Sequence, residues 1–254
     1  MPEGPSIIIL KEAIQKFKGK KILQAEGNAK LDIERMSGQK IIDFKTWGKH
    51  FLICFKDFSL RIHLMMFGTY RVNEEREAKP RFKLTFVNEC INFYACSLKY
   101  IEGELDDTYD WTADVMNDDF NPKAARAKIK KLPEGLICDV LLNQKIFAGV
   151  GNIIKNEVLF RTRLHPETLV KDIPPRKLTE VINDARDYSF EFLKWKKAFV
   201  LKKHWQAYTK KKCPRDSAPI FKKYCGKTKR RTFFCEVCQV LYPVAKNKVR
   251  KNPQ

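Results

Sequence analysis

The chain has 254 residues, of which 44% are hydrophobic and 31% are charged, and its formal net charge is +20. This length allows one large hydrophobic core or two modest ones. We expect no membrane span, signal peptide or transit segment. No stretch approaches the thickness of a bilayer, and the first residues lack the pattern of either targeting signal.

The positive charge is concentrated in the last quarter of the chain. Residues 194–254 contain 19 of the 50 Lys and Arg residues but only two of the 30 acidic residues, so they carry +17 of the net charge. A basic region of this density favours a polyanionic partner, most simply a nucleic acid. An anionic membrane surface is the competing interpretation.

The first predicted element is a helix with one buried face. Apolar residues recur with helical spacing from Ile7 to Phe17, and Ser6 before them is a suitable first residue. Pro2 and Glu3 contribute nothing obvious to this helix, and on their own they are explained as a short polar cap.

Short segments with strand character follow the helix. They alternate between apolar and polar residues and are separated by turn signals, which predicts a β-sandwich or barrel. The segments are KIIDFKTW, KHFLICF, SLRIHLMMF, TYRV, FKLTFV and INFYACSLKYI. Lys49 falls at a turn between two strands. The apolar run Met65, Met66 and Phe67 fits a core, but exposed residues of this kind can also wedge between DNA bases.

The character of the sequence changes near Leu132. The segments GLICDVLLNQ, NIIKNEVLF and RKLTEVINDARDYSFEFLKWKK have helical spacing. We therefore predict an α+β protein with two domains. Residues 1–128 form a β-sandwich with a leading helix, and residues 129–254 form a helical domain with a β-hairpin finger at about 208–245.

Two of the predicted helical segments, within residues 141–161, are joined by Gly149-Val150-Gly151-Asn152. Glycines before a helix let the backbone approach a ligand closely, and the exposed N–H groups of the helix start favour a phosphate. Asn152 and Lys155 would add side-chain contacts. An ordinary helical hairpin with glycine at a tight turn explains the glycines equally well.

The cysteines fall into two sets of four. The set that lies singly in apolar surroundings, Cys54, Cys90, Cys96 and Cys138, is interpreted as reduced core residues. The other set lies within 26 residues and is Cys213, Cys225, Cys235 and Cys238. Without a secretion signal, this clustering favours a metal site over disulfides.

The finger predicts one structural zinc ion with an unusual ligand set. Cys235-x-x-Cys238 is half of a zinc site, and Cys213-x-x-Asp216 has the matching spacing with a carboxylate in place of a thiolate. Cys225 offers the softer ligand, but a hairpin would carry it to the far tip, roughly 20 Å away. We therefore favour Asp216, with a finger that binds metal weakly or not at all as the alternative.

The basic residues of the predicted hairpin tip are suited to phosphate contact. They are Lys227, Lys229, Arg230 and Arg231.

Four pieces of sequence, in this order, resemble the family of formamidopyrimidine-DNA glycosylase and endonuclease VIII. They are PEGP at 2–5, the GK turn at 48–49, LLNQKIFAGVGNIIKNEVLFRTRLHP at 141–166 and RRTFFCEVCQ at 230–239. The long central piece resembles the helix–two-turn–helix element of that family. The resemblance implies a DNA glycosylase with AP lyase activity that acts on damaged double-stranded DNA as a monomer. We expect it in a bacterial nucleoid or a eukaryotic nucleus.

The resemblance also implies the catalytic residues. Pro2, freed by removal of Met1, matches the family's nucleophile. Its amine would attack the sugar C1′ and form an iminium that permits β-elimination and then δ-elimination. Glu3 matches the general acid/base, and Lys49 matches the hairpin lysine that contacts phosphate and assists at the lesion.

The DNA contacts implied by the resemblance come from both domains. Asn152 matches the phosphate-binding residue of the helix–two-turn–helix element, and Gly151 and Lys155 lie beside it. Arg230 matches the finger arginine that grips the phosphates around a flipped nucleotide. Flipping is required because the reacting carbon is inaccessible in a stacked duplex. Met66 is the predicted wedge residue.

The sequence departs from the family pattern in three places. Ser6 stands where the family often has a second acid, and Asp216 replaces an expected finger cysteine. NFYACSLKY lacks the Arg and Phe wedge of the formamidopyrimidine branch. A wedge built from Met65, Met66 and Phe67 would be that of the endonuclease VIII branch, which slightly favours oxidised pyrimidines as substrates.

Two other functions compete with this interpretation. One is a non-catalytic protein that binds damaged or abasic DNA on the same scaffold. Binding alone needs none of Pro2, Glu3 and Lys49, so their joint presence favours the enzyme. The more remote alternative is a zinc protein that binds RNA.

Overall fold

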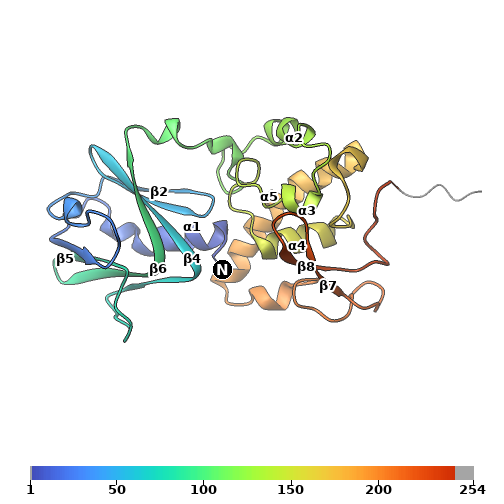
Figure 1. Cartoon of the computed structure of the whole chain (residues 1–254). Helices are drawn as coiled ribbons and strands as arrows, with labels where there is room; N and C mark the ends of the chain where they lie inside the picture. Colours follow the sequence, from blue (N-terminus) through green and yellow to red (C-terminus); the bar gives the residue numbers. More distant parts are fainter. Residues whose placement is uncertain (1, 244–254) are drawn as a thin grey trace, which may run out of the picture.

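The computed structural model describes residues 2–243, which form two halves that meet near the N-terminus (Figure 1). The first half is mainly β-sheet and the second mainly helical, so the predicted α+β class is confirmed. One large hydrophobic core lies between Ile7 and Cys96 and another between Val115 and Phe234. The boundary at residue 128 stays a prediction, and residues 244 and 245 of the predicted finger lie outside the described residues.

The first half is built on one antiparallel sheet with the strand order β1-β5-β6-β4-β3-β2. Its strands are β1 (Gln24–Gly27), β2 (Asp43–Trp47), β3 (His50–Cys54), β4 (Phe58–Val72), β5 (Phe82–Phe86) and β6 (Glu89–Glu102). Alternating apolar residues such as Phe82, Leu84 and Phe86 are buried. This is the pattern expected for strands with one face on a core.

The sheet folds over into a sandwich because its two longest strands belong to both layers. The first part of β4 pairs with β3 and the end of β6, whereas the last part of β4 pairs with the start of β6, which also pairs with β5. The register of the β4–β6 pair shifts between Leu64 and Thr69. Irregularities of this kind bend a strand and increase its twist.

Helix α1 (Gly4–Ile14) packs its buried residues Ile7, Leu10 and Ile14 into the sheet core. The helix begins two residues before the predicted start at Ser6. Pro5 fits the first turn, where a missing N–H costs nothing, and Glu3 is the N-cap residue. Its first turn lies at the junction of the two halves, so Glu3 and Pro2 are held there as well (Figure 1).

The second half is built from four α-helices and a hairpin. They are α2 (Pro122–Lys130), α3 (Ile137–Val140), α4 (Asn152–Arg161), α5 (Pro175–Lys197), β7 (Phe221–Cys225) and β8 (Arg230–Phe234). The prediction of a helix over residues 141–148 is wrong, because these residues form turns. In one of these turns the Lys145 N–H donates to the Asn143 side chain. Within residues 2–243, every helix is too short or too polar to cross a bilayer.

Single turns of 3-10 helix occur in the connections. They are η1 (Gln15–Phe17), η2 (Glu34–Met36), η3 (Leu105–Asp107), η4 (Trp111–Ala113), η5 (Val170–Asp172) and η6 (Leu201–His204).

Three glycines allow the two halves to come into direct backbone contact. The Gly4 N–H donates to the Gly149 carbonyl at 2.9 Å. A Cβ on Gly48, at the β2–β3 turn, would lie 2.7 Å from the Gly149 nitrogen. Gly48 also has a φ of +53°, which other residues rarely adopt, and its N–H donates to buried Asp114 at 2.9 Å. The β2–β3 turn is therefore fixed against the loop that precedes α4.

We expect Gly48→Ala to destabilise the protein by about 3 kcal/mol or more, since the methyl group adds a backbone clash to the cost of a positive φ. Urea or thermal unfolding measures the effect. Gly38→Ala is the matched control: Gly38 has a φ of +79°, but nothing lies within 4 Å of its Cβ position. Gly38→Ala should cost only about 1 kcal/mol. Equal losses in the two variants would show that the junction tolerates the methyl group.

Candidate functional site

Glu3 is held by the N-terminus of a helix 148 residues away in the sequence. Its carboxylate accepts the N–H of Ile153 at 2.8 Å and those of Gly151 and Ile154 at 3.2 Å each. Gly151 is required here, because a Cβ would overlap the carboxylate. The sequence predicted that these N–H groups bind a phosphate, but in the structure they donate hydrogen bonds to the Glu3 carboxylate.

Burial dominates the acidity of Glu3. The side chain is 1% exposed, and this desolvation raises the pKa of its carboxyl group. Nearby Lys49 and the N–H groups of Ile153 and Ile154 act in the opposite direction. A carboxyl group in this balance keeps its proton to a higher pH than an exposed one.

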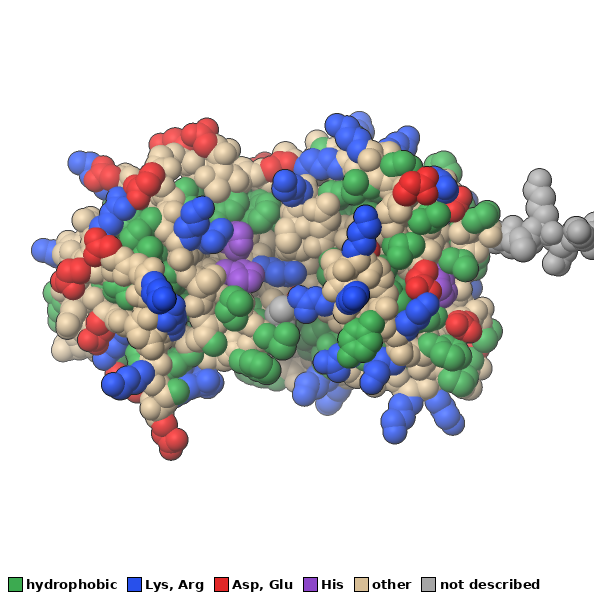
Figure 2. Space-filling model, viewed as in Figure 1, with side chains coloured by type: hydrophobic (Ala, Val, Ile, Leu, Met, Phe, Trp, Pro, Cys, Tyr) green, Lys and Arg blue, Asp and Glu red, His purple; other side chains and the backbone are tan. Residues whose placement is uncertain are grey.

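A cavity of about 290 Å³ lies between the two halves and is lined by residues from distant parts of the chain. Pro2, Lys49, Asn152 and Arg230 all line it. Figure 2 shows a pair of histidines with Lys and Arg side chains beside them in this hollow. Four of the predicted site residues are therefore brought together. The pKa of Lys49 is lowered, mainly by burial and also by the positive charge of Arg230, while the charge of Glu3 acts in the opposite direction.

Two histidines that the sequence analysis missed also line this cavity. His50 and His63 are directly opposite one another on β3 and β4, with ring centroids 5.4 Å apart. His50 Nδ1 and the Tyr109 hydroxyl are 3.2 Å apart. Burial, with Arg61, His63 and Lys49 adding to it, lowers the pKa of His50 to about 4, so the ring is neutral at pH 7. The sequence did carry a signal for this pair, because each histidine lies within one of two neighbouring predicted strands.

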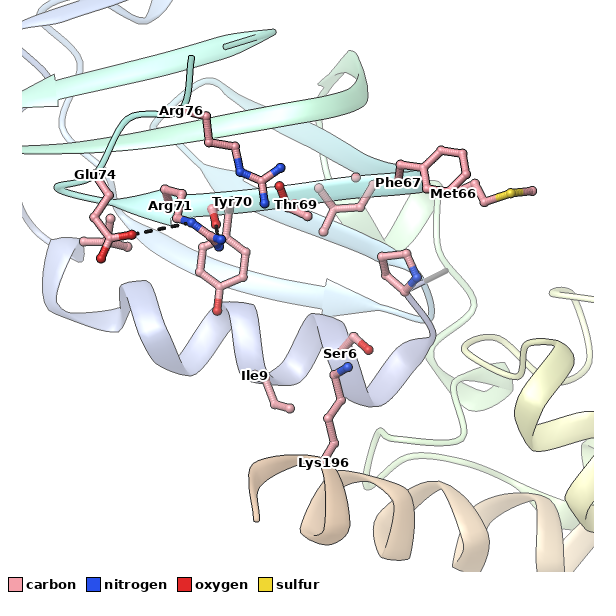
Figure 3. A pocket seen from close by; sticks show the side chains of 14 residues that line it. Ser6, Ile9, Met66, Phe67, Thr69, Tyr70, Arg71, Glu74, Arg76 and Lys196 are labelled. Carbon is pink, nitrogen blue, oxygen red and sulfur yellow. Dashed lines mark hydrogen bonds and ion pairs between the residues drawn. The ribbon is translucent and has the colours of Figure 1, made fainter. Parts of the chain in front are cut away.

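Pro2 also lines a larger cavity of about 880 Å³, whose other side chains are shown in Figure 3. Its polar lining comes from α1, from β4 and the loop after it, and from α5. These residues are Ser6, Thr69, Tyr70, Arg71, Glu74, Arg76 and Lys196. Pro2 and Leu64 are the residues that line both cavities. Pro2 therefore adjoins a narrow cavity lined by Lys49 and Arg230 and a wider cavity with both polar and apolar side chains.

The predicted wedge residues lie exposed at the irregular part of β4. Met65 is 49% exposed, Met66 54% and Phe67 81%, and Met66 and Phe67 reach the rim of the larger cavity (Figure 3). Consecutive exposed apolar residues in a soluble fold are typical of an interaction site. The core interpretation of this run is therefore wrong.

Helix α4 holds strand β8 of the finger through its polar side chains. The Asn152 amide donates to the Arg231 carbonyl at 2.9 Å, and the Lys155 ammonium group donates to the Thr232 hydroxyl at 2.8 Å. Lys155 is completely buried, and this burial lowers its pKa to about 8. Contact between Lys155 and a phosphate stays a prediction, and in this structure the Lys155 amine faces the finger and not the surface.

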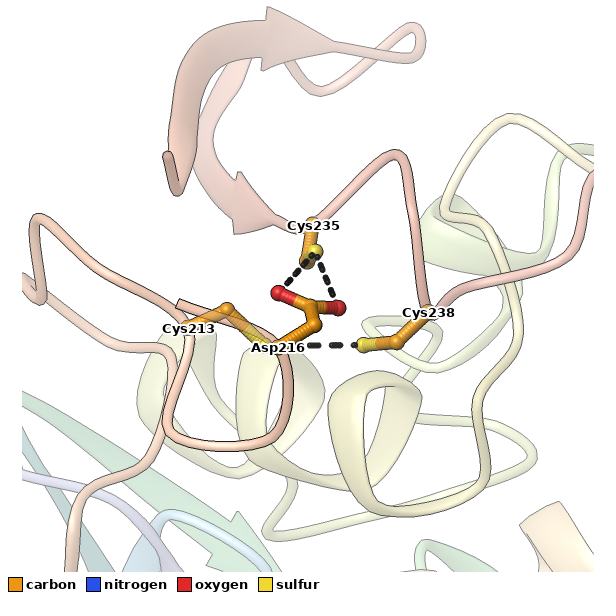
Figure 4. A group of neighbouring side chains, drawn as sticks. All are labelled: Cys213, Asp216, Cys235 and Cys238. Carbon is orange, nitrogen blue, oxygen red and sulfur yellow. Dashed lines mark hydrogen bonds between the residues drawn. The ribbon is translucent and has the colours of Figure 1, made fainter. Parts of the chain in front are cut away.

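The end of the finger opposite its turn gathers four possible metal ligands. One ligand atom each of Cys213, Asp216, Cys235 and Cys238 lies within 4.8 Å of the others (Figure 4). The Sγ atoms of Cys213 and Cys238 are 3.8 Å apart, which is about the edge of a tetrahedron with Zn–S bonds of roughly 2.3 Å. This donor set therefore fits one zinc ion.

Cys225 is not part of this group. It lies opposite Arg230 in the β7–β8 register, and it is buried in the core of the second half.

Comparison with known proteins gives matches along most of the chain. The sequence model of the formamidopyrimidine-DNA glycosylase N-terminal domain matches residues 1–95, and that of the H2TH domain of the same enzyme matches residues 112–198. The formamidopyrimidine-DNA glycosylase of Lactobacillus helveticus is 26% identical over 279 residues, covering 95% of this chain and all of the relative.

Endonuclease 8-like 3 of Mus musculus is 31% identical over 204 residues, covering 77% of this chain and 34% of the relative. The chain thus spans only about a third of the length of the first relatives it matches. A crystal structure of the Lactococcus lactis formamidopyrimidine-DNA glycosylase, bound to DNA with an AP site, has the same fold. The TM-score is 0.83 and the identity 24%, over 93% of this chain and 99% of that one.

The two domain matches follow one another in the order of the family and are supported by relatives that match across their junction. The chain therefore belongs to the family of formamidopyrimidine-DNA glycosylase and endonuclease VIII.

Proposed function

We propose that this protein is a DNA repair glycosylase with AP lyase activity that uses Pro2 as its nucleophile. The observation that carries the proposal is the position of Pro2 between the two cavities. A flipped nucleotide would place its base in the 880 Å³ cavity and its sugar and phosphates toward the narrow basic cavity. The sugar C1′ joins base and sugar, so it would lie at the Pro2 ring.

The proposed reaction needs an amine, a proton carrier and a cation, and the site supplies each. The Pro2 nitrogen, free once Met1 is removed, attacks C1′ while the bond to the base breaks. The bonding electrons leave with the base, which takes up a proton. The amine loses its proton as the bond to C1′ forms. The C1′–O4′ bond of the sugar then breaks, its electrons stay on O4′, which takes up a proton, and an iminium forms between C1′ and the Pro2 nitrogen. The iminium acidifies the C2′–H bond, loss of that proton expels the 3′ phosphate, a second elimination releases the 5′ phosphate, and water hydrolyses the iminium to free the Pro2 amine.

Glu3 follows Pro2 directly and is the group we propose to move protons at the sugar. Burial raises the pKa of its carboxyl group, which favours the protonated form that a proton donor needs. Lys49 is close enough to Glu3 for their charges to interact and would bind the phosphate beside the reacting sugar.

The DNA contacts are proposed from the faces that remain exposed. Arg230 and Asn152 line the basic cavity and would bind backbone phosphates, while Gly151 contributes indirectly by leaving room for Glu3. Met66, with its exposed neighbours, would fill the space left by the flipped nucleotide. The larger cavity has hydrogen-bond donors and acceptors but few aromatic surfaces, and we favour oxidised pyrimidines as the excised bases.

The metal group is proposed to bind one structural zinc ion. Zinc would join the loop of Cys213 and Asp216 to the loop of Cys235 and Cys238, and so hold the two ends of the finger together.

Keeping Met1 in place should abolish formation of the covalent DNA adduct, because the Pro2 nitrogen is then an amide. The measurement is reductive trapping by borohydride on an abasic-site duplex, with intact mass showing whether Met1 is present. DNA binding by the two forms should agree within a few fold. Equal trapping by protein that retains Met1 would remove Pro2 as the nucleophile. Binding without trapping by protein that lacks Met1 would instead favour the non-catalytic DNA-binding function.

Glu3→Gln should slow base release by 100-fold or more, in the usual range of ~10²–10⁴ for general acid–base residues, and should spare more of the cleavage of preformed abasic sites. Glu157→Gln is the matched control. The buried Glu157 carboxylate also accepts three backbone N–H groups, from Gln206, Ala207 and Tyr208, but it holds the segment before the finger, whereas Glu3 directly follows Pro2. A comparable loss of base release in the control would reduce Glu3 to a structural role.

Asp216→Ala should lower the zinc content of the purified protein, whereas Cys225→Ser should leave it at one ion per chain. The reason is that only Asp216 lies among the other three ligands. Metal analysis of both variants under identical dialysis decides between them. Loss of zinc in Cys225→Ser with retention in Asp216→Ala would mean that the ligand assignment is incorrect.

A further inference from the structure

The turn of the finger hairpin is held by a residue from outside the finger. Asp139 of α3 accepts the Lys227 N–H at 2.8 Å, the Thr228 N–H at 3.2 Å and the Thr228 hydroxyl at 2.8 Å. The approach is close, because a Cβ on Gly226 would overlap the Asp139 carboxylate. The finger turn is thus docked on a residue 88 positions earlier in the chain.

Arg230 stands between this docking point and a second one. On its other side, the Arg231 carbonyl is bound by Asn152 at 2.9 Å, and the Phe233 N–H donates to the Asn156 side chain at 2.7 Å. The backbone on both sides of Arg230 is therefore fixed by the helical domain. From there the Arg230 side chain lines the cavity beside Pro2 and Lys49.

The metal group is too distant to set the direction of Arg230. Cys235 follows the end of β8, five residues beyond Arg230. At about 3.3 Å per residue this is roughly 17 Å. The turn also carries Lys227, Lys229 and Arg231, whose mutual repulsion favours an open and disordered tip unless a negative charge offsets it.

We infer that Asp139 is a positioning residue for Arg230. It holds the finger turn so that the guanidinium group of Arg230 enters the narrow cavity and can bind a DNA phosphate there. This inference rests on the proposed function for its substrate, but the docking of the turn is a property of the free protein.

Loss of the Asp139 charge should change the affinity for DNA in the direction opposite to that expected from net charge alone. Removing a negative charge from a DNA-binding protein ordinarily strengthens its binding to a polyanion. Asp139→Ala should instead weaken binding. Glu134→Ala is the matched control. It also removes one negative charge, five residues before Asp139, but the Glu134 carboxylate pairs with Lys171 on the surface, at 2.9 Å.

The experiment measures affinity for a duplex with a tetrahydrofuran abasic-site analogue. We expect Glu134→Ala to bind as tightly as the unaltered protein or slightly more so, and Arg230→Ala to bind about tenfold more weakly, as for the loss of one charge-assisted contact. Asp139→Ala should match Arg230→Ala. The double variant should be no weaker than Arg230→Ala alone, because Asp139 then has nothing left to position. Asp139→Asn, which keeps one acceptor oxygen for Thr228, should be intermediate.

Limited trypsin digestion tests the docking without DNA. Cleavage after Lys227 and Lys229 should be several times faster in Asp139→Ala than in Glu134→Ala, with the zinc content of both unchanged. Equal cleavage, or binding by Asp139→Ala as tight as by Glu134→Ala, would overturn the inference. So would additive losses in the double variant. Failure of the unaltered protein to bind the duplex would count against the proposed function, while the digestion still decides whether Asp139 docks the turn.

Discussion

The contact between the Glu3 carboxylate and the N-terminus of α4 fixes the relation between the two halves of the molecule. A buried carboxylate is stable only if its oxygens are satisfied, and here three backbone N–H groups do this. Because Glu3 adjoins Pro2, the same contact holds Pro2 at the cavities. The Gly4–Gly149 hydrogen bond and the close approach of Gly48 lie at the same place, so the leading helix and the β2–β3 turn are both held against the loop that precedes α4.

Buried or partly buried carboxylates connect distant segments of this strongly basic chain. Asp114 joins the β2–β3 turn to the linker between the halves, and Glu157 joins α4 to the segment before the finger. Asp139 joins α3 to the finger turn. In each case the oxygens accept backbone N–H groups from a distant loop. The positive charge at the surface favours a polyanion, while these acids hold the scaffold that carries it.

The site combines residues from the sheet of the first half with residues from the finger of the second half. His50 and His63 come from neighbouring strands whose pairing is continuous, so their spacing is set by the sheet, and Lys49 lies in the turn directly before His50. Arg230 comes from a two-stranded hairpin, which is only marginally stable alone. The backbone on both sides of Arg230 is held by residues of α3 and α4. The position of Arg230 is therefore open to control by residues outside the hairpin.

The sequence by itself determined the features that depend on local pattern. Alternation predicted the strands, helical spacing predicted α1, α4 and α5, and hairpin geometry correctly separated Cys225 from the group that contains Asp216. The motifs that resemble the family named Pro2, Lys49, Asn152 and Arg230, which meet at one cavity.

Only the tertiary structure decided which polar groups face one another. Nothing local shows that Glu3 takes the N–H groups of α4 that a phosphate would otherwise bind. Nothing local shows that Lys155 is buried against Thr232, or that Asp139 docks the finger turn. Each of these contacts joins residues at least 77 positions apart. Sequence periodicity reports which face of an element is buried, but the partner of a buried charge is set by how distant elements pack.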